Sequence, residues 1–204
     1  MIVGSLILAG GRSRRMGQPK ESLALGDTTL LGHMVDTLLS CTFPVVVVAR
    51  DKNQDLPPFK LEAETAFDAK QDEGPLMGLL AGLRALESSC DAVFVTGCDT
   101  PFLSARVVDW MTQQLGEHEV VMPRIDDRLQ PLAAVYRTRI LPTVEAMVAE
   151  GTRTPRSLAE QCDTRILTAA EIDAFDPQRD FLKNINNPAD YQTLVAQFDQ
   201  RPQA

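Results

Sequence analysis

The chain has 204 residues, of which 44% are hydrophobic and 24% charged, and its formal net charge is −8. This length can bury one sizeable core and is short for two, so we expect a single domain over 1–204 with a frayed tail at 201–204. The acidic balance argues against a nucleic-acid partner, which normally needs a broad basic face. No apolar run approaches the roughly 20 residues that span a bilayer, so no membrane partner is expected.

The cysteines form neither a zinc framework nor a disulfide scaffold, because they lie far apart and include no C-x-x-C pair: Cys41, Cys90, Cys98 and Cys162. The N-terminus enters an apolar run directly, without the charged region of a secretory signal. We therefore expect a protein of the reducing cytoplasm.

Short apolar runs alternate with segments of helical period from the start of the chain. The first strand is expected over Ile2–Leu8, and a helix over Leu30–Leu39 with Thr28–Thr29 as its cap. The continuous run Val45–Val48 is typical of a strand buried on both faces. The polar segment Arg50–Lys60, which contains two prolines, is expected to be a loop.

The alternation continues to the C-terminus. Further strands are expected at 61–65, 92–95, 119–122, 132–136 and 164–167. Further helices are expected at 76–86, from a cap at Ser104 to 115, and at 141–150, 154–161 and 188–198. This order predicts an α/β fold with a mostly parallel central sheet between two layers of helices.

A basic loop follows the first strand and contains Arg12, Arg14, Arg15 and Lys20 after Gly10-Gly11. It matches neither G-x-x-x-x-G-K-[ST] nor G-x-G-x-x-G. Glycines can turn with positive φ and present N–H groups to phosphate oxygens, while Arg15 and Lys20 can neutralise phosphate charge. The loop therefore favours a nucleoside triphosphate site over the alternative, an ordinary glycine turn with solvated basic residues.

An aspartate, Asp99, stands at the end of the buried strand at 92–95, in the segment Thr96–Pro101. A carboxylate at this place is a natural Mg²⁺ ligand, because Mg²⁺ takes one or two carboxylates and completes its shell with substrate phosphates. A turn that starts a helix is the alternative interpretation. Because the carboxyl ends of parallel strands share one edge of the sheet, Asp99 is expected close to the basic loop.

Three further features carry weaker signals. The segment Gly74–Gly78 begins a helix that can lie near the base or ribose of a nucleotide, whereas Asp68 and Asp72 before it read as solvated loop residues. Asn184 and Asn186 alternate in an extended segment, which can place two amides on one side for a polar substrate; a turn and cap is equally compatible with that spacing.

Two ring-bearing side chains, those of His33 and Trp110, are interpreted as structural. His33 falls in a helix with no Ser or Cys nucleophile in its neighbourhood, and Trp110 follows a helical pattern that favours packing over base stacking. The sequence therefore contains no convincing nucleophile–base pair.

The segment Leu8–Lys20 resembles the L-A-G-G-x-S-x-R-M-G-x-x-K signature of nucleotidyltransferases with a Rossmann-like fold. Within that group the chain is similar to the molybdenum cofactor guanylyltransferases. Four other stretches carry this similarity in the order of the family and extend it over nearly the whole chain: Gly74–Gly78, Cys98–Leu103, Gln130–Tyr136 and Phe181–Pro188.

The resemblance implies a single-domain Rossmann-like three-layer sandwich and a set of site residues. GTP is implied to bind against Leu8, Ala9, Gly10 and Gly11, with Lys20 at its phosphates and Asp68 near the position of a nucleotide-contacting aspartate. Asp99 matches the family's Mg²⁺ ligand, and Asn184 and Asn186 match asparagines near the pterin substrate. Arg15, Lys20 and Asp99 are the expected catalytic set.

The implied reaction is transfer of GMP from GTP to the terminal phosphate of molybdenum-molybdopterin, which yields the guanine dinucleotide cofactor and pyrophosphate. Molybdoenzymes or cofactor-delivery proteins are expected as further partners. Three alternatives stay open: cytidylyl transfer to the same pterin, nucleotidyl transfer to a sugar phosphate, and a non-catalytic nucleotide-binding or cofactor-delivery role.

Two positions depart from the family pattern. The residue before Lys20 is often aspartate and is Pro19 here. An asparagine often found at the end of the second strand is replaced within Val45–Arg50, where Val48 stands at its place. The second change bears on the choice of base more than on the chemistry.

Overall fold

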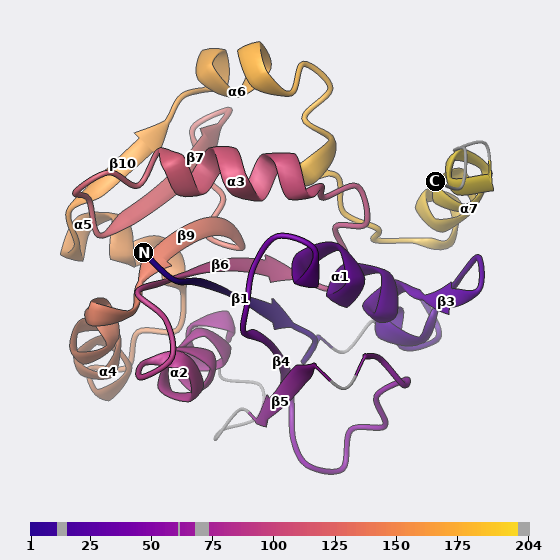
Figure 1. Ribbon diagram of the computed structural model, residues 1–204, viewed down its shortest axis with the longest axis horizontal. Coiled ribbons are helices and arrows are strands. Elements are labelled where there is room, and N and C mark those ends of the chain that lie inside the picture. Colours follow the sequence, from indigo (N-terminus) through magenta and orange to yellow (C-terminus); the bar gives the residue numbers. More distant parts are fainter. Residues whose placement is uncertain (12–15, 61, 68–73, 200–204) are drawn as a thin grey trace.

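The computed structural model describes residues 1–11, 16–60, 62–67 and 74–199. Its main sheet has the strand order β10-β7-β9-β6-β1-β4-β5, with β8 paired to β7 (Figure 1). Neighbours along this order run parallel except β9, which is antiparallel to both β6 and β7. The prediction of a mostly parallel sheet is therefore confirmed. The strands are β1 Val3–Leu8, β4 Val45–Ala49, β5 Ala63–Phe67, β6 Ala92–Gly97, β7 Val120–Ile125, β8 Arg128–Leu129, β9 Ala133–Arg137 and β10 Thr164–Leu167.

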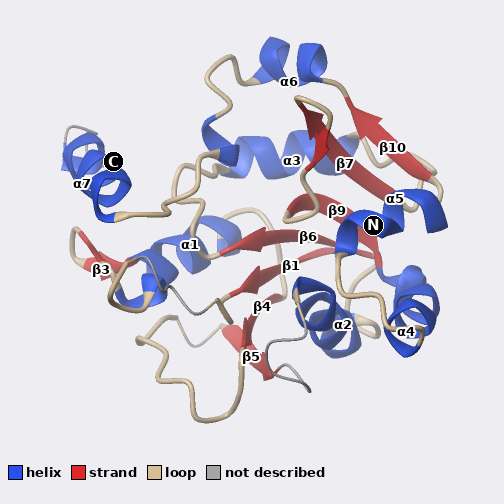
Figure 2. Ribbon diagram, turned by 180° about the vertical axis from the view of Figure 1, so that it is seen from behind, coloured by secondary structure: helices blue, strands red, loops and turns tan. Residues whose placement is uncertain are grey.

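Helices cover both faces of the sheet (Figure 2). Leu6 and Ile7, adjacent in β1 and fully buried, enter two different core clusters because successive side chains of a strand point to opposite faces. The Ile7 face packs against α1, α3 and α6, and the Leu6 face against α2, α4 and α5. These helices are α1 Leu30–Leu39, α2 Pro75–Leu86, α3 Ala105–Gln113, α4 Leu141–Ala149, α5 Leu158–Gln161 and α6 Ala169–Phe175.

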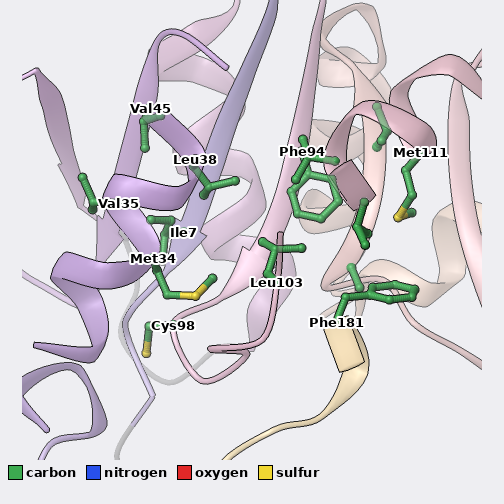
Figure 3. Close-up of a cluster of buried hydrophobic side chains, with 14 of the residues drawn as sticks. Ile7, Met34, Val35, Leu38, Val45, Phe94, Cys98, Leu103, Met111 and Phe181 are labelled. Atoms are coloured by element: carbon green, nitrogen blue, oxygen red, sulfur yellow. The ribbon is translucent and has the colours of Figure 1, made fainter. Parts of the chain in front are cut away.

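The larger cluster lies between α1 and α3 on one face of the sheet (Figure 3). Met34 and Leu38 of α1 point toward Ile7 of β1, and Leu103 and Met111 lie on the α3 side near Phe94. Cys98, immediately after β6, is a buried member of this cluster. The residue that precedes Asp99 is thus anchored in the core.

A third, smaller core holds the C-terminal helix α7, Pro188–Asp199. Ile185 and Leu194 pack there against Leu25 and Leu30, beside the short hairpin of β2 (Ala24–Leu25) and β3 (Thr28–Thr29). The hydroxyl of Tyr191 donates to the carbonyl of Ala24 at 2.7 Å. This core therefore ties the segment around Asn184–Asn187 to the part of the chain that follows the basic loop.

Helix α2 lies unusually close to β1 because it carries glycine where it crosses the strand. A Cβ at Gly82 would sit 2.6 Å from Leu6 Cδ1, and one at Gly78 would sit 3.3 Å from Leu8 Cδ2. Both glycines therefore serve packing.

Several boundaries differ from expectation. The β2–β3 hairpin and α6 were not expected, and β5 begins at Ala63 rather than at 61. Thr29 caps α1 by accepting from Gly32 N–H, as expected, whereas Ser104 stands at the N-cap of α3 without a side-chain capping bond. None of the helices among the described residues is long and apolar enough to cross a membrane.

Candidate active site

The basic loop and the Asp99 segment leave the sheet side by side. Leu8, the last residue of β1, is in register with Gly97, the last residue of β6. The pairing extends beyond both strands, since Cys98 N–H donates to Leu8 O at 3.2 Å and Ala9 N–H donates to Val48 O at 2.9 Å. Both motifs therefore lie at the same edge of the sheet, as their positions after parallel strands predict.

Lys20 and Asp99 form an ion pair at this edge. Lys20 Nζ lies 2.9 Å from Asp99 Oδ2, and the two side chains are only 15% and 23% exposed. The same Nζ donates to Asn186 Oδ1 at 3.4 Å. Three candidate residues from segments far apart in the sequence are thus in contact around one ammonium group.

The Asp99 carboxylate folds back over Gly97. A Cβ at Gly97 would sit 2.7 Å from Asp99 Oδ1, so only glycine leaves room for this orientation. The Asp99 carbonyl accepts from Ile185 N–H at 2.9 Å. A partly exposed carboxylate suits Mg²⁺, although no three His, Cys, Asp or Glu side chains gather into a metal cluster in the described part of the chain.

The asparagine segment is extended, with alternating side chains. Asn184 and Asn186 are exposed and Ile185 between them is buried in the third core. This alternation agrees with two amides on one side of the segment, and Asn186 reaches Lys20, whereas the substrate contact of both asparagines stays a prediction. The cap is made by Asn187, which accepts from Asp190 N–H at 3.0 Å while the Asp190 carboxylate accepts from Asn187 N–H at 3.2 Å.

Residues 5–166 match the family model of the MobA-like NTP transferase domain. The chain belongs to this family. Its members are nucleotidyltransferases, so the protein is an enzyme of that class.

Relatives of this MobA-like chain match almost end to end. A protein of Methanosarcina mazei described as a "probable molybdenum cofactor guanylyltransferase" is 31% identical over 201 residues, covering 94% of this chain and 89% of its own. A protein of the same description from Mycolicibacterium paratuberculosis is 34% identical over 200 residues, and the match covers 96% of this chain and 96% of that protein.

Solved structures share the MobA-like fold. Molybdopterin-guanine dinucleotide biosynthesis protein A from Archaeoglobus fulgidus has a TM-score of 0.79 at 22% identity, covering 97% of this chain and 100% of that one. The 2-C-methyl-D-erythritol 4-phosphate cytidylyltransferase from Thermus thermophilus has a TM-score of 0.69 at 19% identity, covering 98% and 100%. At these identities the likeness confirms the Rossmann-like nucleotidyltransferase fold, which enzymes of different base specificity share.

The glycine pair of the MobA-like loop differs from expectation in its backbone. Neither Gly10 nor Gly11 adopts a positive φ. A Cβ at Gly10 would lie 3.4 Å from the Arg50 backbone, which is ordinary van der Waals contact, so the space around Gly10 does not by itself require glycine. Within the described residues, the N–H groups of Gly10 and Gly11 donate to no acceptor, which leaves them available to a phosphate.

Several sequence predictions lie outside the described residues: Arg12, Arg14, Arg15, Asp68 and Asp72. Leu8 and Ala9 are described; Ala9 is fully buried and Leu8 is partly covered by α2. The nucleotide contact assigned to them stays a prediction.

The N–H groups of Leu76 and Met77, at the start of α2, are engaged within the chain. Gly74 has a φ of 96°, and a Cβ there would sit 2.6 Å from Arg153 O. Leu76 N–H donates to Arg153 O at 3.2 Å and Met77 N–H donates to Gly74 O at 3.2 Å. This helix start can still border a nucleotide, but the N–H groups of Leu76 and Met77 already have acceptors within the chain.

Sequence reasoning missed two polar residues that contact the ends of the loop, the buried Glu21 and the partly buried Gln54. Glu21 is 4% exposed and receives a hydrogen bond from Gln54 Nε2 at 2.7 Å. The same Nε2 donates to Ala9 O at 2.8 Å, and Gln54 Oε1 accepts from Arg50 N–H at 2.7 Å. Nearby Val48 is buried beneath α2, so it does not replace the polar group of the family's asparagine.

The remaining candidate groups are structural. His33 Nε2 lies 3.0 Å from Pro101 O, and Trp110 stacks on Phe175 with ring centroids 4.4 Å apart. Burial raises the pKa of the Cys98 thiol, and the charges of Asp99 and Glu21 raise that pKa further. The thiol is therefore neutral at neutral pH and is no nucleophile.

Proposed function

We propose that the protein transfers GMP from GTP to the terminal phosphate of molybdenum-molybdopterin, forming the guanine dinucleotide cofactor and pyrophosphate. The observation that carries this proposal is the contact of Lys20, Asp99 and Asn186 at the carboxyl edge of the sheet. The relatives described as guanylyltransferases support the choice of substrates, since they match over nearly the whole chain.

The first loop holds the nucleotide in this proposal. Its free N–H groups at Gly10 and Gly11 bind phosphate oxygens, and Lys20 neutralises charge on the triphosphate. Arg15 adds a second cation and Asp68 a nucleotide contact; the sequence pattern supports both.

The reaction is a displacement at the α-phosphorus of GTP. An oxygen of the acceptor phosphate forms the new P–O bond, and the bond from the α-phosphorus to the bridging oxygen breaks, so that the electron pair leaves with pyrophosphate. The attacking phosphate is already an anion and requires no strong general base, which agrees with a site built from Lys20, Asp99 and amides. Lys20 stabilises the charge that grows on the leaving group.

Asp99 is the proposed Mg²⁺ ligand. Its carboxylate is partly exposed, and the missing Cβ of Gly97 gives it room, so the residues fit a hard cation. Bound Mg²⁺ would supply Lewis-acid polarisation of phosphate oxygens. In the structure Asp99 Oδ2 pairs with Lys20, which holds both side chains at the reaction edge before substrate arrives.

The acceptor binds on the asparagine side. The exposed amides of Asn184 and Asn186 can donate to and accept from a polar pterin, and Asn186 positions Lys20 between the two substrates. We place the whole chain, 1–204, in one cytoplasmic nucleotidyltransferase domain that passes its product to a molybdoenzyme or a cofactor-delivery protein.

Turnover with purified protein tests the proposal. Molybdenum-molybdopterin and Mg²⁺ are supplied with GTP, CTP or UTP in turn, and pyrophosphate and the dinucleotide product are measured. We expect product with GTP far above the others. Preference for CTP or activity on a sugar phosphate instead would overturn the assigned substrates, and nucleotide binding without pyrophosphate release would overturn catalysis.

A further inference from the structure

A single amide, that of Gln54, joins three segments at the ends of the first loop. Gln54, in the loop after β4, donates to Ala9 O at the end of β1 and to Glu21 Oε1 in the turn that carries Lys20. Its Oε1 accepts from the N–H of Arg50 at 2.7 Å. Both N–H groups and the carbonyl of this amide are therefore engaged, and its orientation is set.

Glu21 is an unusual acceptor for this amide. The residue is 4% exposed, and its second carboxylate oxygen, Oε2, has no hydrogen-bond partner within the described residues. Burying a carboxylate with an unpaired oxygen opposes folding, and such groups persist where they serve function. A charged acceptor forms a shorter and stronger bond, which holds the Gln54 amide firmly.

The hydrogen bond from Gln54 to the Ala9 carbonyl determines the direction in which the N–H of Gly10 points. The Ala9–Gly10 peptide unit is planar and trans, so the Ala9 carbonyl and the Gly10 N–H point in opposite directions. Because Gln54 draws the carbonyl toward itself, the Gly10 N–H is turned away from the network. Within the described residues this N–H has no acceptor in the chain.

We propose that Gln54 and Glu21 are positioning residues that fix the Ala9–Gly10 peptide and thereby aim the Gly10 N–H at a phosphate oxygen of GTP. This inference rests on the proposed function, since it takes the first loop as the triphosphate site. Glu21 acts through Gln54, and Gln54 acts through the Ala9 carbonyl; neither touches the nucleotide.

Two substitutions separate the parts of this network. Gln54→Leu removes every bond of the amide and frees the Ala9 carbonyl, so the peptide can rotate. Glu21→Gln keeps an acceptor oxygen for Gln54 at similar shape, removes the charge, and places an NH2 group in place of Oε2. Gln113→Leu and Glu87→Gln are matched controls at exposed positions at the C-terminal ends of α3 and α2.

The test measures dissociation constants for GTP and for guanosine with Mg²⁺ present, by calorimetry and NMR titration, alongside thermal unfolding. We expect Gln54→Leu to weaken GTP binding about 10-fold, the loss typical of one hydrogen bond to a charged group, and to leave guanosine binding unchanged. Glu21→Gln should weaken GTP binding less, in the same direction, and the controls should match the wild type.

Distinct results would overturn the inference. Unchanged GTP binding in Gln54→Leu, or in Glu21→Gln if the first variant does not fold, would remove the network from phosphate binding. Equal loss of GTP and guanosine would show general distortion of the site. A wild-type protein that binds no GTP would contradict the proposed function itself, whereas wild-type binding with insensitive variants contradicts only this inference.

Discussion

At the scale of single residues, the ion pair between Lys20 and Asp99 is the main finding. Each was expected from its own stretch of sequence, and parallel pairing of β1 with β6 places the two stretches together. The pair is partly buried, so salt screens it less than an exposed pair. Around it we propose two kinds of residue, those that contact substrate and those, such as Glu21, that support the loop.

Lys20→Ala should raise the KM for GTP and lower kcat, because in the proposed reaction the lysine neutralises charge in both the bound triphosphate and the leaving pyrophosphate. A loss of roughly 100-fold in kcat/KM fits removal of one electrostatic contact in the transition state. Steady-state kinetics measure it, with Lys60→Ala as the control, since Lys60 pairs with Asp36 on the surface. Unchanged kinetics would remove Lys20 from the site.

Three buried or partly buried cysteines, Cys41, Cys98 and Cys162, allow a prediction of how stability changes at high pH. Burial raises the pKa of Cys41 and Cys162 to about 11, and that of Cys98 is raised as well. Unfolded thiols ionise near pH 8.5 whereas the folded ones stay neutral, so the free energy of unfolding should fall as pH rises from about 8.5 to 11.

Melting temperatures across that pH range measure the effect. Cys98→Val should flatten the fall, because this variant loses a thiol that ionises only after unfolding. A melting temperature that rises with pH in this window would contradict the assignment.

At the scale of elements, tight packing of α2 on β1 gives a direct test. Gly82→Ala should destabilise the protein by about 1–2 kcal/mol although alanine favours helix, because the new Cβ would overlap buried Leu6. Urea unfolding measures this. The control, Ala85→Gly at an exposed position of the same helix, should cost less than about 1 kcal/mol. A stabilising Gly82→Ala would show that the helix can move outward.

Strands with long apolar runs could be predicted from the sequence, whereas the two-residue strands could not. The apolar residues Leu6–Ile7 and Val45–Val48 indicate buried strands, because a strand covered on both faces of the sheet needs apolar side chains on both. The two-residue strands β2 and β3 carry no periodicity and depend on α7, which packs on them from the far end of the chain. Helix α6 did have a local signal, the capping box of Thr168 and Glu171.

The residues of the candidate site likewise include some that could be predicted from the sequence and some that could not. Lys20, Asp99 and Asn186 were predictable because each belongs to a distinctive motif at the edge of the sheet. Glu21 and Gln54 were not, since their hydrogen bonds join segments 33 residues apart and neither belongs to a local pattern.

At the scale of the whole molecule, the segment that carries Asn184 and Asn186 is attached to its own core. The third core holds α7 and Ile185, and is separate from the two clusters that flank the sheet. Packing of α7 therefore helps to fix the segment that carries Asn184 and Asn186, and the hydrogen bond from Ile185 N–H to Asp99 O joins that segment to the end of β6.

Leu194→Ala should loosen this core selectively. Leu194 is 1% exposed, and removing it leaves a cavity with a cost of about 2–5 kcal/mol if the site cannot collapse. Amide hydrogen exchange should become faster over α7 and the β2–β3 hairpin while β1 and β6 stay protected. Uniformly faster exchange would instead show that the three cores unfold as one unit.

The central claim is that Lys20 and Asp99 form the centre of a GMP transfer. GTP labelled at its α-phosphate tests this most directly, with molybdenum-molybdopterin as acceptor and Asp99→Ala as the comparison. We predict that the wild-type protein moves the label into the pterin product, and that Asp99→Ala forms no labelled product at saturating GTP. Near-normal labelling by Asp99→Ala, or label found only in free GMP, GDP or unreacted GTP with the wild type, would contradict the account.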